Sequence, residues 1–187
     1  MSQVRRVIVA LIVLSSLSLA HSPRMVIEGA HLSFANAYAI PDASISWALY
    51  AKLPAKSIEW YRADLKAGQV FYVSMTVPQI RGLEDFAPSF AIVGEGLAAS
   101  KLEFVPEGMG AIVVPPSPAT LEVHAGHGYW VRQNTTIKVP FTGTYFVAVF
   151  HTIGKAGKYV LAPGRTEVFV NQGRASSSEI DTYFGKP

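Results

Sequence analysis

The sequence of 187 residues contains no cysteine. This absence excludes a disulfide framework, a cysteine nucleophile and a lipidated cysteine at a processed N-terminus. A chain of this length is long enough to be held together by one hydrophobic core without disulfides. Charged residues are also scarce, at 16% of the chain against about 25% in an average globular protein, whereas 50% of the residues are hydrophobic.

The basic side chains are few and do not cluster. The formal net charge is +3, but Arg5 and Arg6 fall in a segment that we expect to be removed, which leaves 14 basic against 13 acidic side chains. Nucleic-acid binding needs clustered lysine and arginine side chains that displace counterions from the phosphates. The sequence therefore predicts no nucleic-acid partner.

The longest apolar run is too short for a membrane-spanning helix, which needs about 20 residues. Residues 7–20 read VIVALIVLSSLSLA, follow two arginines and end with the small residues Ser18 and Ala20 at positions −3 and −1. This three-part pattern is typical of a secretory signal peptide. We therefore expect residues 1–20 to be cleaved, to be the only part of the chain that contacts a membrane, and to leave a mature protein that is secreted, extracellular or at the cell surface.

The rest of the chain shows alternating apolar residues rather than helical periodicity. In residues 69–77 every second side chain is apolar, which is typical of a half-buried strand, and residues 145–150 are apolar on both sides, which predicts a central strand. Glycine and proline turns separate about eight to ten such segments. The sequence therefore predicts an all-β protein with a single, jelly-roll-like β-sandwich.

This pattern divides the chain into four parts. Residues 1–20 are the signal peptide, residues 21–42 an N-terminal arm, residues 43–170 the β-sandwich domain, and residues 171–187 a loose polar tail. No segment shows a convincing amphipathic helix.

Two β-hairpins are predicted inside the sandwich, one over residues 57–77 and one over residues 143–161. In each of them a short glycine-containing loop joins two extended segments. Residues 166–170 are expected to form a last edge strand.

Several segments of the predicted sandwich resemble one known family. Residues 58–74 read IEWYRADLKAGQVFYVS, residues 88–94 read PSFAIVG, residues 139–149 read VPFTGTYFVAV, and residues 157–161 read GKYVL. In this order they resemble the opening, middle and closing strands of bacterial and archaeal pre-peptidase C-terminal domains, over residues 57–162. The resemblance implies a non-catalytic jelly-roll sandwich of the kind that accompanies secreted hydrolases or surface proteins.

Aromatic residues are the candidate binding groups, because a row of exposed rings can hold a sugar or a peptide. Tyr129 and Trp130, next to a glycine-rich loop, form the first predicted binding pair, and Trp60 is a third candidate. Trp47 and Tyr61 are considered with them. Core packing is the competing interpretation, because an alternating strand buries every second side chain.

Metal-binding patterns are weak. His124 and His127 lie three residues apart, and imidazole binds divalent metals, but the glycines around them also fit two solvated loop histidines. No Asp-x-Asp-x-Asp calcium loop is present. The acidic residues considered for calcium are Asp42, Glu84, Asp85 and Glu95. The sequence predicts no cofactor, and Asn134 begins an Asn-x-Thr sequon that is a glycosylation candidate.

The sequence contains no Gly-x-Ser-x-Gly, His-Glu-x-x-His or phosphate-loop motif. It therefore predicts a protein that is not an enzyme but a secreted binding or accessory module, with a cell-surface glycan or protein as partner. One alternative is a self-associating subunit of an extracellular filament, in which the arm of residues 21–42 completes a neighbour's sheet. A metal-dependent enzyme that uses the histidines is the other alternative.

Overall fold

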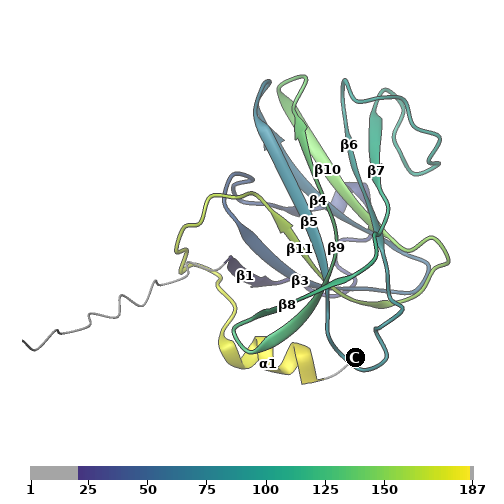
Figure 1. Ribbon diagram of the computed structural model, residues 1–187. Helices are drawn as coiled ribbons and strands as arrows, with labels where there is room; N and C mark the ends of the chain where they lie inside the picture. Colours follow the sequence, from purple (N-terminus) through teal and green to yellow (C-terminus); the bar gives the residue numbers. More distant parts are fainter. Residues whose placement is uncertain (1–20, 186–187) are drawn as a thin grey trace, which may run out of the picture.

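The computed structural model describes residues 21–185, which form two β-sheets packed face to face (Figure 1). The strands of the first sheet are β1 (Ser22–Met25), β3 (Trp47–Leu53), β5 (Val70–Pro78), β8 (Thr120–His124), β9 (His127–Lys138) and β11 (Gly157–Pro163). The strands of the second sheet are β2 (Tyr38–Ala39), β4 (Ile58–Leu65), β6 (Ser89–Gly94), β7 (Gly110–Val114) and β10 (Gly143–Phe150). The prediction of an all-β sandwich is confirmed.

The order of strands is β1-β3-β11-β5-β9-β8 in the six-stranded sheet and β2-β4-β10-β6-β7 in the five-stranded sheet. Both sheets are mixed, because β1 runs parallel to β3 and β2 runs parallel to β4. The remaining pairs of named strands are antiparallel. The two parallel edge strands, β1 and β2, belong to the N-terminal arm. The other strands of both sheets begin at Trp47 or later, so the arm adds one edge strand to each sheet.

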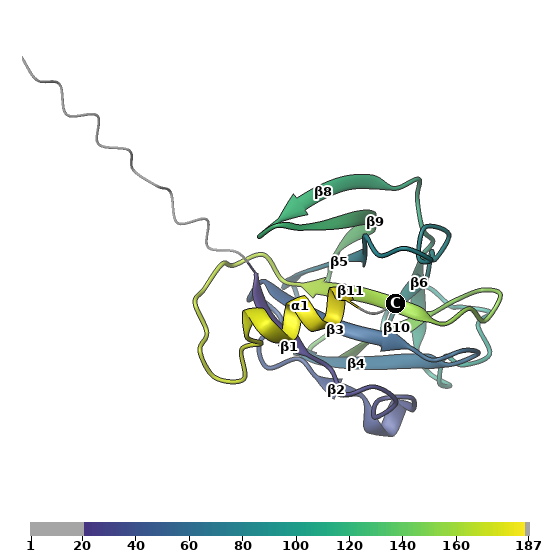
Figure 2. The same ribbon diagram turned by 90° about the horizontal axis from the view of Figure 1, so that it is seen from below.

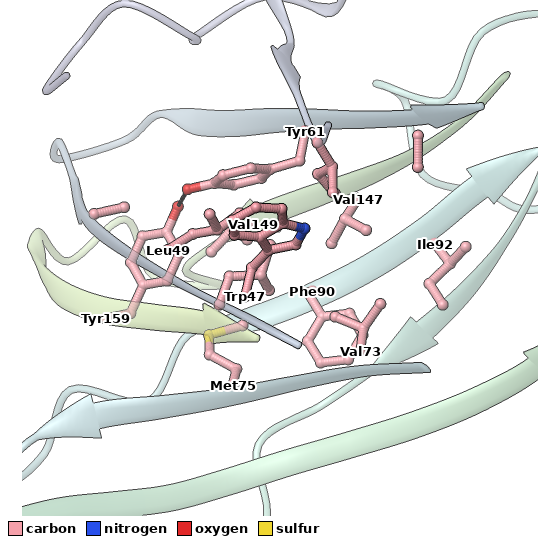
Figure 3. Packing of buried hydrophobic residues seen from close by; sticks show 14 of the residues in the cluster. Trp47, Leu49, Tyr61, Val73, Met75, Phe90, Ile92, Val147, Val149 and Tyr159 are labelled. Carbon is pink, nitrogen blue, oxygen red and sulfur yellow. Dashed lines mark hydrogen bonds between the residues drawn. The ribbon is translucent and has the colours of Figure 1, made fainter. Parts of the chain in front are cut away.

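Period-two burial builds the interface between the sheets. The apolar side chains of β5 that point inward, Phe71, Val73, Met75 and Val77, have no exposed surface. They pack against inward side chains of the opposite sheet, and Figure 3 shows Val73 and Met75 among Trp47, Phe90 and Val149. Burial of this kind contributes about 1.5–3 kcal/mol for each large apolar side chain.

β10 is the middle strand of the five-stranded sheet, as its two apolar sides predict. Val147 and Val149 face the main core, whereas Phe146 and Ala148 face a second apolar cluster on the outer side of the sheet. Part of the arm covers this outer side: the ring of Phe34 stacks on that of Phe146 with centroids 3.8 Å apart. The strand is therefore buried on both faces.

Both predicted hairpins are wrong. β4 lies in the five-stranded sheet and pairs with β10, whereas β5 lies in the six-stranded sheet and pairs with β11 and β9. β10 and β11 are divided between the sheets in the same way. Alternating residues and a glycine loop predict two strands joined by a reversal of the chain, but they do not say whether the two strands share a sheet. A loop of a few residues can also span the roughly 10 Å between packed sheets, and here the chain crosses from one sheet to the other.

The arm of residues 21–42 is part of its own domain. It contains β1, β2 and a short 3₁₀ helix, η1 (Phe34–Asn36), and each strand pairs with the edge of one sheet. The backbone N–H of Ile40 also donates to Arg62 O at 2.9 Å. The exchange of this arm between molecules would have to break these pairs, so the structure gives the filament alternative no support.

The C-terminal tail is not loose throughout, because residues Ser177–Gly185 form a helix, α1. Ser176 and Glu179 form a reciprocal cap: the N–H of Glu179 donates to the hydroxyl of Ser176, and the Glu179 carboxylate accepts from the N–H of Ser176. α1 lies across the outer face of the six-stranded sheet (Figure 2). The Ser-x-x-Glu pattern was the sequence signal for this helix.

Two further predictions concern the ends of the sandwich. The predicted signal peptide, residues 1–20, lies outside the described residues. The edge strand expected at residues 166–170 is not formed, and Thr166 instead makes an isolated bridge to Ile45. Within residues 21–185, no helix has the length and apolar character needed to cross a membrane.

Candidate functional site

A groove of about 590 Å³ opens where β4 begins and β10 ends. Its apolar lining comes from Ile58, Phe104 and Phe150, which are half-buried, and from Ile153, which is exposed. Lys56 and His151 line it as well and add basic groups to its rim. The groove therefore combines a flat apolar surface with polar groups that can orient a ligand, which is the usual composition of a binding site.

Backbone geometry sets the position of the groove's rim. Lys56 has a positive φ of 56°, and its N–H donates to Gly154 O at 3.0 Å. Gly154 has a φ of +68°, and a Cβ built on it would lie 2.9 Å from Cγ of Lys56. This hydrogen bond joins the turn that contains Lys56 to the turn that contains Gly154. Because Gly154 has no Cβ, the side chain of Lys56 can lie against it.

The charge at the groove comes from Lys56. The ring of His151 stacks on Phe86 with centroids 5.5 Å apart, and its Nδ1 accepts from the N–H of Ile153. Desolvation lowers the pKa of His151, and the charge of Lys155 lowers it further. Both effects favour the neutral imidazole, so Lys56 is the cationic residue in the lining of the groove.

Trp60 supports the floor of this groove rather than contacting solvent. It is buried in the second apolar cluster, and its ring meets Phe104 edge-on with centroids 5.7 Å apart. Phe104 in turn meets Phe150 at 5.2 Å. The predicted binding residue thus contacts one of the two rings that line the groove, and no pattern in the sequence marked those two rings or Lys56.

Tyr129 and Trp130 do not form an exposed aromatic platform. Tyr129 is only 7% exposed, and its hydroxyl lies 2.8 Å from that of Tyr50. Trp130, on the opposite face of β9, is half-buried against the main core. Trp47 and Tyr61 are also core residues. The alternation of β9 separates the predicted pair, which is the competing interpretation given above.

The two candidate histidines, which end β8 and begin β9, are paired with separate carboxylates. Nε2 of His124 lies 3.0 Å from Glu122 Oε2, and Nε2 of His127 lies 3.0 Å from Asp181 Oδ1 on α1. Among residues 21–185, no three side chains of His, Cys, Asp or Glu gather in a metal-binding group. This applies to the four acidic calcium candidates as well. Asn134 is exposed on β9, where its glycosylation remains a prediction.

A buried carboxyl group was missed by the sequence analysis. Glu59 points into the sandwich from β4 and is fully buried; Tyr159 donates to its Oε2 at 2.5 Å, while Oε1 has no partner. The hydroxyl of Tyr61 meets that of Tyr159 at 2.6 Å (Figure 3). Burial raises the pKa of Glu59 to about 7. A charged residue at an inward position of an alternating strand was the available signal.

Comparison with known proteins finds similar solved structures but no family. No family model matches the chain, and no curated protein matches it. The periplasmic g-type lysozyme inhibitor PliG of Aeromonas hydrophila is similar, with 17% identity over 76% of this chain and 95% of that chain and a TM-score of 0.39.

The surface-associated copper-binding protein CorA of Methylomicrobium album BG8 is also similar, with 10% identity, coverage of 78% of this chain and 99% of that chain, and a TM-score of 0.29. Both TM-scores are below 0.5, so neither likeness carries an argument about function. The described residues themselves define the class: a single β-sandwich of two mixed sheets, with a groove, lined in part by Lys56, where β4 begins and β10 ends.

Proposed function

We propose that this protein is an exported, non-catalytic binding module, and that the groove next to Lys56 binds an acidic glycan at the cell surface. The observation that carries the proposal is the composition of the groove: Phe104 and Phe150 offer ring faces on which a sugar can pack, and Lys56 stands at the rim. A carboxylate on the sugar would meet the ammonium group and gain a charge-assisted hydrogen bond.

Export is supported by the sequence of residues 1–20, which has the three parts of a secretory signal peptide. The resemblance to pre-peptidase C-terminal domains supports the same proposal, since those domains are accessory modules of exported proteins. The two-sheet architecture agrees with that resemblance without testing it.

The hydrogen-bonding of the histidines supports a non-catalytic role. Within residues 21–185 one serine–histidine pair is found, with Nδ1 of His21 2.5 Å from the hydroxyl of Ser46. Ser46 is only 3% exposed, so this hydroxyl is not presented to a substrate. A nucleophile needs access to the reacting carbon as well as a base.

The experiment is a titration of the mature protein with polygalacturonate, an acidic polysaccharide, and with neutral dextran. Binding to polygalacturonate alone is expected. Lys56→Asn should weaken it by about three- to tenfold, because asparagine tolerates the positive φ of this position but carries no charge.

Lys66→Asn is the matched control, because Lys66 is an exposed lysine that does not line the groove. It should leave the affinity unchanged. Equal loss in both variants would reduce the effect to net charge, and absence of binding to polygalacturonate by the native chain would overturn the proposed ligand. Binding of a surface protein that competes for Lys56 would assign the groove to a protein partner instead.

A further inference from the structure

The two outer edges of the six-stranded sheet approach each other. β1 and β8 are the first and last strands in its order, and next to them Tyr50 of β3 and Tyr129 of β9 share a hydrogen bond across the outer face, over the two strands between them. In Figures 1 and 2 the start of β1 lies near the tip of the β8–β9 hairpin. His21 immediately precedes β1, and His124 is the last residue of β8.

His21 is held in place on this side of the sheet. The N–H of Ser22 donates to Ser46 O at 2.8 Å, and the Ser22 hydroxyl donates to Val168 O at 2.8 Å. The imidazole of His21 contacts the Ser46 hydroxyl through Nδ1. The charged groups that act on His21 are His124, Glu167 and Glu122. Two imidazoles and two carboxylates therefore share one region.

Processing would add one more ligand to this region. Ser18 and Ala20 predict cleavage between Ala20 and His21, which would make His21 the first residue of the mature chain. An N-terminal histidine has a free α-amine in addition to Nδ1, and these two nitrogens can bind the same metal ion in a six-membered chelate ring. The side chains of residues 21–185 alone form no three-ligand group, and the amine supplies a donor that side chains cannot.

We propose that the mature protein binds one divalent transition-metal ion through the α-amine and Nδ1 of His21 and the imidazole of His124. The site rests on the exported state in the proposed function but not on the groove. Nitrogen ligands suit Cu²⁺, Ni²⁺ and Zn²⁺, and Cu²⁺ is bound most tightly of the three by a given nitrogen site. Glu122 and Glu167 offset the charge of the ion.

Metal binding at this place competes with protons and with two hydrogen bonds. Nδ1 of His21 must exchange Ser46 for the metal, and His124 must exchange Glu122. The α-amine, with an ordinary pKa of about 8, must lose its proton. Affinity is therefore expected to rise with pH between about 6 and 8, as protons are displaced by the metal.

The test uses two chains that differ by one residue. The mature chain is released from a cleavable fusion so that His21 is the first residue, and a second chain carries one extra glycine before His21. Each is titrated with Cu²⁺ by calorimetry, and nitrogen coordination is read from the electron paramagnetic resonance spectrum. The expected result is one Cu²⁺ per mature chain and at least a tenfold weaker affinity for the extended chain.

His124→Ala in the mature chain should also weaken Cu²⁺ binding at least tenfold. His31→Ala is the control and should leave the affinity unchanged, because the His31 ring hydrogen-bonds to Asn36 O in another part of the fold.

Equal Cu²⁺ affinity of the mature and extended chains would overturn the proposal, and so would an unchanged affinity of His124→Ala. The extended chain keeps the groove, so its binding to polygalacturonate distinguishes failure of the metal site from failure of the proposed function. Mass measurement of the exported protein must find His21 first; another N-terminus would overturn the site.

Discussion

Two pairs of hydrogen-bonded tyrosines occupy opposite sides of the six-stranded sheet. Tyr61 and Tyr159 meet between the two sheets with their hydroxyl oxygens 2.6 Å apart, and Tyr50 and Tyr129 meet on the outer face at 2.8 Å. All four side chains are buried. The pairs differ in what lies next to them, because the inner pair continues to the carboxyl group of Glu59, whereas the outer pair is covered by α1.

The inner pair shows how the core accommodates an ionisable group. Because Tyr159 donates to Glu59, Tyr61 must donate to Tyr159, so each hydroxyl in the chain has an acceptor. Oε1 of Glu59 has no partner, and burial raises the pKa of the group to about 7. The outer pair brings no ionisable carboxyl into the interior. The contribution of the inner tyrosine pair to stability is therefore expected to depend on pH, whereas that of the outer pair is not.

The largest effect is expected for Glu59→Gln. Folding raises the pKa of Glu59 from 4.5 to about 7, so the folded state holds its proton more tightly than the unfolded state. The free energy of unfolding should then fall as pH rises from 4.5 to 7 and level off above 7, by up to about 3 kcal/mol. Glutamine keeps an acceptor for Tyr159 but cannot ionise, so the variant should be more stable than the native protein by about this amount at pH 8.

Urea unfolding of both proteins at pH 4 and pH 8 measures this difference. At pH 4 the two stabilities should agree within about 1 kcal/mol, because the carboxyl group is then neutral in both states. An equal difference at both pH values would show that Glu59 is not protonated in the folded protein near neutral pH.

Tyr159→Phe breaks the inner pair and is expected to have the next largest effect. It removes the acceptor of Tyr61 and the donor to Oε2 of Glu59, a buried carboxyl group whose Oε1 already has no partner. The loss of stability should be about 2 kcal/mol at pH 8 and smaller at pH 5, where the carboxyl group is neutral. The unfolding midpoint in urea measures it, and a loss that is larger at pH 5 than at pH 8 would contradict this assignment.

Tyr50→Phe makes the matching change in the outer pair. It removes one hydrogen bond to Tyr129 and no contact with a carboxyl group, so the loss should be about 1 kcal/mol. Between pH 4 and pH 9 this loss should stay constant in the same urea experiment. A pH dependence similar to that of Tyr159→Phe would show that the two sides of the sheet do not differ in the way described here.

The sequence was sufficient for the layers of the fold but not for the order of its strands. The alternation of Phe71 to Val77 and the two apolar sides of residues 145–150 predicted inward faces and a central strand, and both are observed. This pattern does not predict which strands pair. Apolar and polar residues alternate in β4 and β5 in the same way whether the two strands share a sheet or face each other. The crossover depends on contacts between residues far apart in the chain.

The candidate sites were less predictable, for a related reason. Aromatic type alone suggested Tyr129 and Trp60, but both rings are buried on the outer faces of the sheets, where α1 covers Tyr129 and the arm covers Trp60. The groove instead depends on Phe104, which lies in an irregular segment, and on the positive φ of Lys56, which favours glycine or asparagine. Neither Phe104 nor Lys56 belongs to a run of alternating apolar residues, so the sequence pattern did not identify either of them as a site residue.

The smallest effect is expected at the edge of the outer pair, where α1 meets the β8–β9 hairpin. Asp181→Asn removes the charge that faces His127, but this carboxylate is 67% exposed and the pair is accessible to solvent. The loss should be below about 0.5 kcal/mol. The ring of His127 still stacks on Phe184 with centroids 4.2 Å apart, so α1 should stay in place and Tyr129 should remain covered.

Near-ultraviolet circular dichroism of Asp181→Asn, expected to match that of the native protein, checks this. A changed aromatic signal would mean that the ion pair, rather than the stacked rings, holds the helix against the sheet.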